Sequence, residues 1–251
     1  MKKIDRIGEI NYNNFGSVMK ITNYRKTTDI DVYFEEYNWT KEHTQYNNFK
    51  KGNVKCPYER RFYNKGYIAE GKYKVKINRK PTKHYQTWQA MLKRAYDPKY
   101  IQKYPTYKGC KVYPEWHNFQ IFSEWLDENY YEIEGERMEL DKDILIKGNK
   151  IYSPENCVFV PRSINTLFIK SNGRRGNLPV GVTHLNKKYR ACYNMDGKLK
   201  YLGCYNTPDE AFKVYKNFKE KHIKEIAEEY KNVIPQKLYE AMLRYEVDID
   251  D

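Results

Sequence analysis

The sequence predicts an α+β protein made of small modules rather than one large domain. Strand-like segments dominate residues 1–80, amphipathic helix patterns dominate residues 84–131, and residues 178–231 are typical of three strands followed by a helix. The mean hydropathy of −0.97 is low for a single large core. Tyr, Phe and Trp nevertheless make up 16% of the 251 residues, which is not a disordered composition.

Residues 1–80 are expected to form a small β-rich module, a twisted sheet or barrel. Residues 18–21 and 30–34 have strand composition, and the second segment alternates apolar and polar side chains. Gly16 and Gly66 mark turns around them. These residues carry no recognisable chemistry, so no role is assigned to them.

Residues 84–131 are expected to be helical. Four apolar side chains recur at helical spacing and define one buried face: Trp88, Met91, Leu92 and Ala95. Pro98 and Pro105 are expected to end this first helical region. Residues 115–131 repeat the pattern with several aromatic side chains, which are expected in the core.

Residues 138–169 predict a strand, a turn, a second strand and the start of a helix. Leu140 and Ile144 flank the polar run of Asp141, Lys142 and Asp143. Pro161 suits the first turn of a helix, and Asn165 follows one turn later.

The C-terminal third divides into a linker, a small module and a tail. Residues 170–177 are a flexible basic linker containing Arg174 and Arg175. Residues 178–231 are the three-strand and helix module, and residues 232–251 are a last helix and an acidic tail. Alternation along the strands sends Ala191 and Tyr193 towards the helix. A second set is expected on the opposite face: Lys188, Arg190, Cys192, Asn194 and Tyr201.

The charge predicts a polyanionic partner. The formal net charge is +13, and residues 50–110 alone carry 17 basic and 3 acidic side chains. Lysines in that segment alternate with tyrosines, a pattern that suits contacts with a nucleic-acid backbone and occasional stacking on bases. We therefore expect a nucleic acid as the partner. No segment is apolar enough for a membrane helix or a secretory signal, which predicts a cytoplasmic protein, in a bacterial host cell given the resemblance described next.

A family resemblance follows from the order of several motifs. It comprises Trp88, Met91, Arg94 and Tyr96, then Tyr107, Gly109, Trp116 and Trp125, and then Leu140-Asp141, Gly148, Tyr152-Ser153-Pro154, Asn156-Cys157 and Asn165. In this order the chain resembles bacteriophage HNH-type proteins, which are similar to homing endonucleases and often carry an AP2-like DNA-binding domain. The resemblance covers about residues 85–218.

The resemblance implies a metal-dependent nuclease site in residues 84–169. It places Asp141 or Asp143 beside the general base and makes Asp141 and Asn165 ligands of Mg²⁺ or another divalent metal. The histidine that acts as base in such enzymes is replaced by Lys142, and a protonated lysine cannot accept a proton. We expect this HNH-like module to be inactive, and DNA binding itself to need no cofactor.

Residues 178–231 resemble an AP2 domain through several short motifs. They are Gly181-Val182, Tyr189-Arg190-Ala191, Tyr201-Leu202-Gly203, and Thr207 to Ala211. AP2 domains lay a three-stranded sheet in the major groove of DNA. The resemblance implies base contacts from Arg190 and Asn194 beside Lys188 and Tyr201, and phosphate contacts from Lys198 and Lys200. The linker residues Arg174 and Arg175 are further candidate DNA contacts.

Two other functions stay open. The chain could be an active HNH nicking or homing endonuclease, which requires metal-dependent cleavage. It could instead be a phage inhibitor that binds a host protein. The sequence does not choose among oligomeric states.

Overall fold

In the computed structural model, which describes residues 5–169, 178–195 and 197–249, the chain contains both helices and strands, as the α+β prediction requires. Contacts between Cα atoms divide it into two compact units. The first unit comprises residues 1–128 and 150–153, and the second comprises residues 129–149 and 154–251. The segments expected from the sequence are finer than this division and stay predictions.

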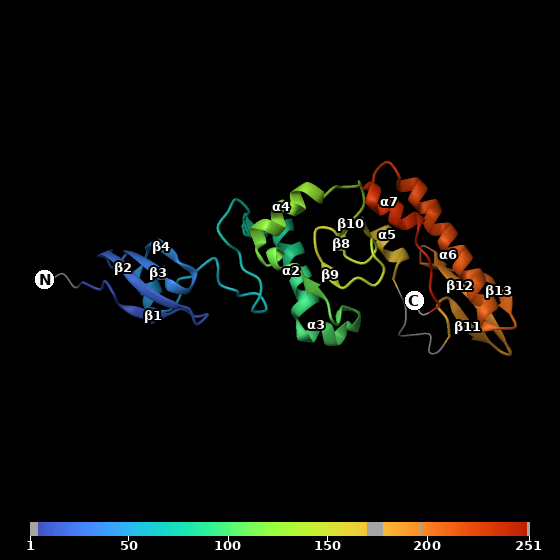
Figure 1. Ribbon diagram of the computed structural model, residues 1–251, viewed down its shortest axis with the longest axis horizontal. Helices are drawn as coiled ribbons and strands as arrows, with labels where there is room; N and C mark the ends of the chain where they lie inside the picture. Colours follow the sequence, from blue (N-terminus) through green and yellow to red (C-terminus); the bar gives the residue numbers. More distant parts are fainter. Residues whose placement is uncertain (1–4, 170–177, 196, 250–251) are drawn as a thin grey trace. The chain divides into compact units, whose positions relative to one another are not determined.

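The first unit begins with a four-stranded antiparallel sheet, drawn in blue in Figure 1. Its strands follow chain order: β1 (Ile10–Tyr12), β2 (Val18–Lys26), β3 (Asp29–Phe34) and β4 (Trp39–Thr44). Alternation on β3 buries Ile30, Val32 and Phe34 completely. The short helix α1 (Tyr46–Lys50) packs Phe49 on this face, so the sheet has a core of its own.

The second part of the first unit is helical and aromatic. Its elements are a hairpin of β5 (Lys76–Ile77) and β6 (Lys80–Pro81), then α2 (Lys83–Tyr96), α3 (Pro98–Lys103), β7 (Lys111–Val112), α4 (Phe119–Asn129) and β9 (Ile151–Tyr152). Thr82 caps α2 by accepting a hydrogen bond from the Tyr85 amide, and the face predicted from the sequence is buried. Trp88 contacts Phe119 edge-to-face, with ring centroids 5.5 Å apart.

Both prolines follow the end of a helix, as the sequence predicted, and Pro98 also begins a new helix. Helix α2 ends at Tyr96, before Asp97, and Pro98 stands in the first turn of α3. The Asp97 side chain accepts hydrogen bonds from the amides of Lys99 and Tyr100, which caps this new helix. A proline needs no amide partner at that position, so it starts a helix as readily as it ends one.

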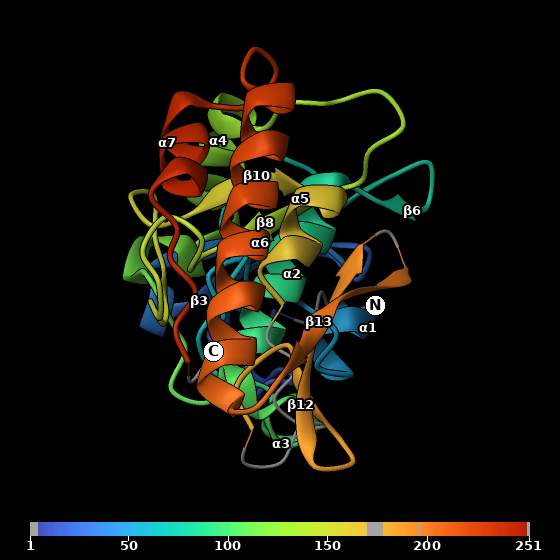
Figure 2. The same cartoon turned by 90° about the vertical axis from the view of Figure 1, so that its right-hand side faces the viewer.

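The second unit contains a two-stranded ladder and a three-stranded sheet, each with helices. The ladder is β8 (Met138–Asp141) paired with β10 (Val158–Pro161), and α5 (Arg162–Leu167) follows it directly. The sheet consists of β11 (Val182–Leu185), β12 (Lys188–Met195) and β13 (Lys198–Tyr205). The helices α6 (Pro208–Tyr230) and α7 (Gln236–Leu243) pack against each other (Figure 2).

Helix α6 starts with a complete capping box. Thr207 accepts a hydrogen bond from the Glu210 amide, and Glu210 accepts one from the Thr207 amide in return. The helix takes part in two cores. Ala211 and Tyr215 pack with the three-stranded sheet, whereas Ile223 and Ala227 pack with α7 and the β8–β10 ladder.

Candidate nucleic-acid interface

The three-stranded sheet of the second unit has one covered face and one outward face. Ala191 and Tyr193 of β12 are buried against Ala211 and Tyr215 of α6. Because successive side chains of a strand alternate, the residues between them point away from α6. This outward face is the candidate interface.

The first row of the outward face centres on Arg190. Thr183 of β11 and Cys204 of β13 lie directly opposite Arg190 on its two neighbouring strands. The Arg190 Nε donates to Thr183 Oγ1 at 3.3 Å. Among the described residues no carboxylate forms an ion pair with Arg190, so its guanidinium is left to face solvent. A guanidinium donates in a planar fork, which suits paired hydrogen bonds to a partner.

A bulge brings Tyr201 into the same face. Ala191 pairs with Gly203 and Cys192 pairs with Tyr201, so Leu202 has no residue opposite it. The extra residue puts both Tyr201 and Cys204 on the outward side. Tyr201 is 57% exposed. A hydrogen bond with Cys204 is the main cause that raises the pKa of the Tyr201 hydroxyl.

The remaining predicted contacts divide between the two faces. Lys188 and Asn194 are exposed on the outward face, opposite Leu185 and Leu199. Leu199 is 68% exposed, so the outward face mixes apolar and polar groups.

Lys200 lies on the helix side of the sheet. It pairs with the inward residue Tyr193, and its Nζ lies 4.7 Å from the centre of the Phe218 ring. Lys198 alternates with it and is exposed beside the turn. The predicted contacts Arg174 and Arg175 lie outside the described residues.

The strand, turn, strand and helix predicted for residues 138–169 form a ββα arrangement of β8, β10 and α5. Glu139 and Asp141 lie on one face of β8, opposite Val160 and Val158. Asn165 of α5 donates from its Nδ2 to Glu139 Oε2 at 2.8 Å. The structure thus joins Asn165 to Glu139, a residue that sequence analysis did not select. The signal was present, because Glu139 stands two positions before Asp141 and shares its face.

The polar run after β8 is largely satisfied internally. Asp141 Oδ1 accepts hydrogen bonds from the amides of Asp143 and Ile144 at 2.9 and 2.7 Å. Burial, and then the charge of Asp143, raise the pKa of Asp141. Lys142 is buried, and its Nζ forms an ion pair with Asp143 Oδ1 at 3.2 Å. Lys142 and Asp143 therefore neutralise each other.

The side chains on this face of β8, together with Asn165, carry oxygen atoms of the kind that binds hard cations. Glu139, Asp141 and Asn165 offer carboxylate and amide oxygens, the donors that Mg²⁺ accepts. Among the described residues of the ββα arrangement there is no histidine to activate water. The donor set therefore fits a metal ion, but it lacks the base that a histidine would supply.

In the first unit, a different group of side chains has its potential metal-binding atoms close together. Asp29, Asp31 and His43 bring their ligand atoms together, the only such group of His, Cys, Asp and Glu found in the described residues. Arg25 already lies among them, with its Nη2 2.8 Å from Asp29 Oδ1 and 2.5 Å from Asp31 Oδ1. Hydrogen bonds from Arg25 lower the pKa of both carboxyls. This cluster is an ion-pair network centred on a guanidinium.

The basic segment of the first unit presents a charged hairpin. Asn78 and Arg79 have positive φ angles of 49° and 64°, which fold β5 back onto β6 in a tight turn. The hairpin and its flanks carry six exposed cations: Lys72, Lys74, Lys76, Arg79, Lys80 and Lys83.

The tyrosines of the same segment have other partners. Tyr85 packs with Trp88 and Phe119 in the aromatic core. Tyr73 donates to Asp127. These two rings are therefore structural, whereas the charges on the hairpin remain accessible.

Comparison with models of known protein families, with curated proteins and with solved structures found no match. In the described part of the chain, no helix combines the length and apolar character needed to cross a membrane.

Proposed function

We propose that this protein binds double-stranded DNA through the outward face of β11–β13. The observation that carries the proposal is the arrangement around Arg190. An arginine held by one threonine hydroxyl, an exposed asparagine and an exposed tyrosine share one face of a sheet whose other face is covered by α6.

The chemistry of this face suits the major groove. A guanidinium can donate two hydrogen bonds to O6 and N7 of guanine, and an asparagine amide can pair with N6 and N7 of adenine. Arg190 and Asn194 would take these roles. The exposed Leu199 beside them offers an apolar contact for a thymine methyl group. Lys188 at the end of the same face would contact phosphate.

The proposal includes the finer assignments made from the sequence. We propose an AP2-like module in residues 178–231, an HNH-like ββα module that acts as scaffold, and an origin in a phage or mobile element. The six exposed cations around the β5–β6 hairpin support additional phosphate contacts that do not depend on sequence.

A selection from random duplexes followed by anisotropy titration tests the proposal. Arg190→Ala should weaken binding to the selected duplex by about 1–3 kcal/mol and relax the preference at one base pair. The matched control is Lys221→Ala, which removes an exposed charge from α6 in the same unit. Equal affinity of both variants, or no selected sequence, would remove the proposed interface.

The contact between Asn165 and Glu139 favours a second candidate, metal-dependent DNA cleavage. Asp141 shares a face of β8 with Glu139, and the three residues supply oxygen atoms of the type that Mg²⁺ accepts. Supercoiled DNA should be incubated with the protein in Mg²⁺ or Mn²⁺ and in EDTA. Nicked product that requires metal and disappears in Asn165→Ala would establish the nuclease; intact DNA in all lanes would leave binding alone.

A further inference from the structure

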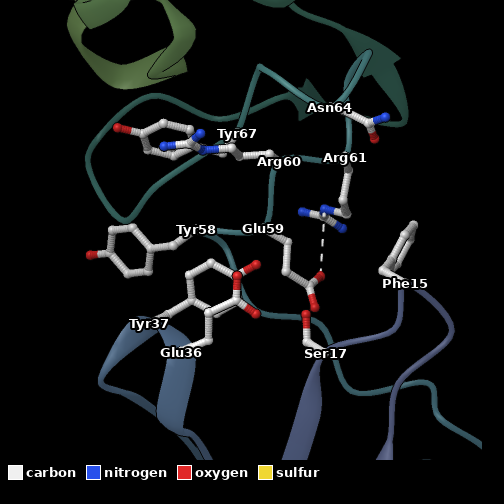
Figure 3. A pocket seen from close by; sticks show the side chains of 10 residues that line it. All are labelled: Phe15, Ser17, Glu36, Tyr37, Tyr58, Glu59, Arg60, Arg61, Asn64 and Tyr67. Carbon is white, nitrogen blue, oxygen red and sulfur yellow. Dashed lines mark ion pairs between the residues drawn. The ribbon is translucent and has the colours of Figure 1, made fainter.

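A pocket in the first unit lies between the N-terminal sheet and residues 58–67 (Figure 3). Phe15, Ser17, Glu36 and Tyr37 approach from the sheet side. The opposite side is formed by Tyr58, Glu59, Arg60, Arg61, Asn64 and Tyr67. Its volume of about 620 Å³ is in the range of small-molecule sites and far exceeds what one ion needs.

Glu59 places an unused acceptor in this pocket. The residue is only 2% exposed, and its Oε1 accepts a hydrogen bond from the side-chain Nδ2 of Asn13. Oε2 is buried and has no hydrogen-bond partner among the described residues. Arg61 Nε is the nearest cation at 3.9 Å, and it too lacks a hydrogen bond there. Buried polar atoms are normally paired, so an unpaired carboxylate oxygen in a pocket indicates a ligand that donates to it.

The walls favour a flat, uncharged group. Four aromatic rings line the pocket: Phe15, Tyr37, Tyr58 and Tyr67. Arg61 covers the ring of Phe15 at 5.2 Å, and the two carboxylates of the lining are balanced by two arginines. A cationic ligand would meet both arginines, whereas a neutral aromatic ring can stack without that repulsion.

Arg60 lines the pocket and is exposed, so the rim carries a positive charge there. Lys65 is exposed and follows the lining residue Asn64 directly in the chain. After burial, the charges of Lys65 and Arg60 both lower the pKa of His117. A positive rim next to an aromatic pocket is the arrangement that a base linked to a phosphate requires.

We propose that this pocket binds the base of one unpaired nucleotide, with an N–H edge of the base donating to Glu59 and the phosphate lying at Arg60 and Lys65. Guanine should bind best, because it has two adjacent donors, N1–H and N2–H, and either of them can donate to the free Oε2. Thymine, which has no amino group, should bind worst. The proposal concerns the first unit and does not depend on duplex binding by the second.

The free nucleotides and an unpaired base in a DNA strand are two sources of the same ligand. The first arm titrates dGMP, dAMP, dCMP and TMP by calorimetry. The second arm titrates a hairpin with one bulged guanine against the same hairpin with that guanine paired. Arg190→Ala protein is used for the second arm, so that duplex contacts of the other sheet are reduced.

Two pairs of variants test the contacts. Glu59→Gln should weaken guanine binding about tenfold or more, because it replaces the free acceptor with a donor. Glu70→Gln, an exposed carboxyl of the same segment outside the pocket, should leave binding unchanged. Arg60→Ala should weaken binding several-fold, roughly the effect of one lost phosphate contact, whereas Lys55→Ala should not. If Glu59→Gln does not fold, the second pair decides.

The two titrations distinguish binding of a free nucleotide from binding of an unpaired base in a strand. Binding of dGMP identifies a free nucleotide as a sufficient ligand, and binding of the bulged hairpin alone identifies a strand. No binding in either arm, or binding that Glu59→Gln and Arg60→Ala leave unchanged, would overturn the proposal. Preferential binding of a trimethyllysine peptide would also overturn it, since the aromatic rings would then enclose a cation. None of these results depends on the duplex affinity of the wild-type protein.

Discussion

The two sheets of this protein use an arginine in opposite ways. Arg25 in the four-stranded sheet donates to Asp29 and Asp31 with four hydrogen bonds. Arg190 in the three-stranded sheet donates to a single threonine hydroxyl. A guanidinium whose donors are already used by carboxylates stabilises the fold, whereas one with donors left over can recognise a partner. The comparison explains why we assign binding to the second sheet.

The largest expected effect comes from the packing that presents Arg190. Gly181 has φ +76°, and an added Cβ would lie 2.0 Å from the Tyr215 ring. Gly181→Ala should therefore destabilise the second unit by about 2–4 kcal/mol and weaken DNA binding with it. Gly135→Ala is the control, because Gly135 has a similar φ of +78° with nothing within 4 Å of the added atom. Urea unfolding measures both; equal losses would show that the contact with Tyr215 is not limiting.

Alanine substitutions of Arg190 and Arg25 should have opposite effects on DNA affinity and on thermal stability. Arg190→Ala should reduce DNA affinity about 5- to 150-fold with little change in Tm, since the side chain is held by one neutral contact. Arg25→Ala should lower Tm and leave DNA affinity unchanged. Anisotropy and thermal melting on both variants give the result. A drop in DNA affinity for Arg25→Ala would contradict the assignment of separate roles.

The ion pairs of Arg25 should also make the stability of the four-stranded sheet depend on acid pH. Arg25 lowers the pKa of Asp31 from 3.8 to about 2, and that of Asp29 further. A carboxyl with a lowered pKa stabilises the fold fully above its unfolded value near pH 4, and this contribution is lost as the pH falls towards 2. Unfolding midpoints at pH 5 and pH 2.5 should therefore differ less in Arg25→Gln than in the wild type. An unchanged pH dependence would mean that other carboxyls dominate.

The smallest effect concerns two lysines on opposite sides of the second sheet. Lys188 shares the outward face with Arg190, whereas Lys200 lies over Phe218. Lys188→Ala should reduce the slope of log affinity against log salt by about 1, as expected for one lost phosphate contact. Lys200→Ala should change the slope less. The opposite order would place the DNA on the helix side.

Local patterns predicted much of the secondary structure. The strands around Ile21 and Ile30 and the helix face of Trp88 depend on neighbours within a few residues. Pairings between distant segments were not predictable in this way. The parallel pairing of β7 with β9 joins Lys111 to Ile151, and no local pattern encodes such a contact.

The candidate sites show the same limit. Alternation placed Ala191 and Tyr193 against the helix, but the bulge at Leu202 decides which β13 residues share a face with Arg190. Glu139 becomes a candidate site residue only through its hydrogen bond with Asn165, which the sequence alone does not reveal. Glu59 gave no signal at all, because its burial depends on Asn13, which lies 46 positions earlier.

The length of helix α6 and its packing into two cores couple the two ends of the helix mechanically. Its 23 residues form a rod roughly 34 Å long that is packed into one core near its start and into another towards its end. Tilting such a rod by 10° about one end moves the other by roughly 6 Å. A displacement of the three-stranded sheet would therefore be transmitted along α6 to the core that the helix shares with the β8–β10 ladder.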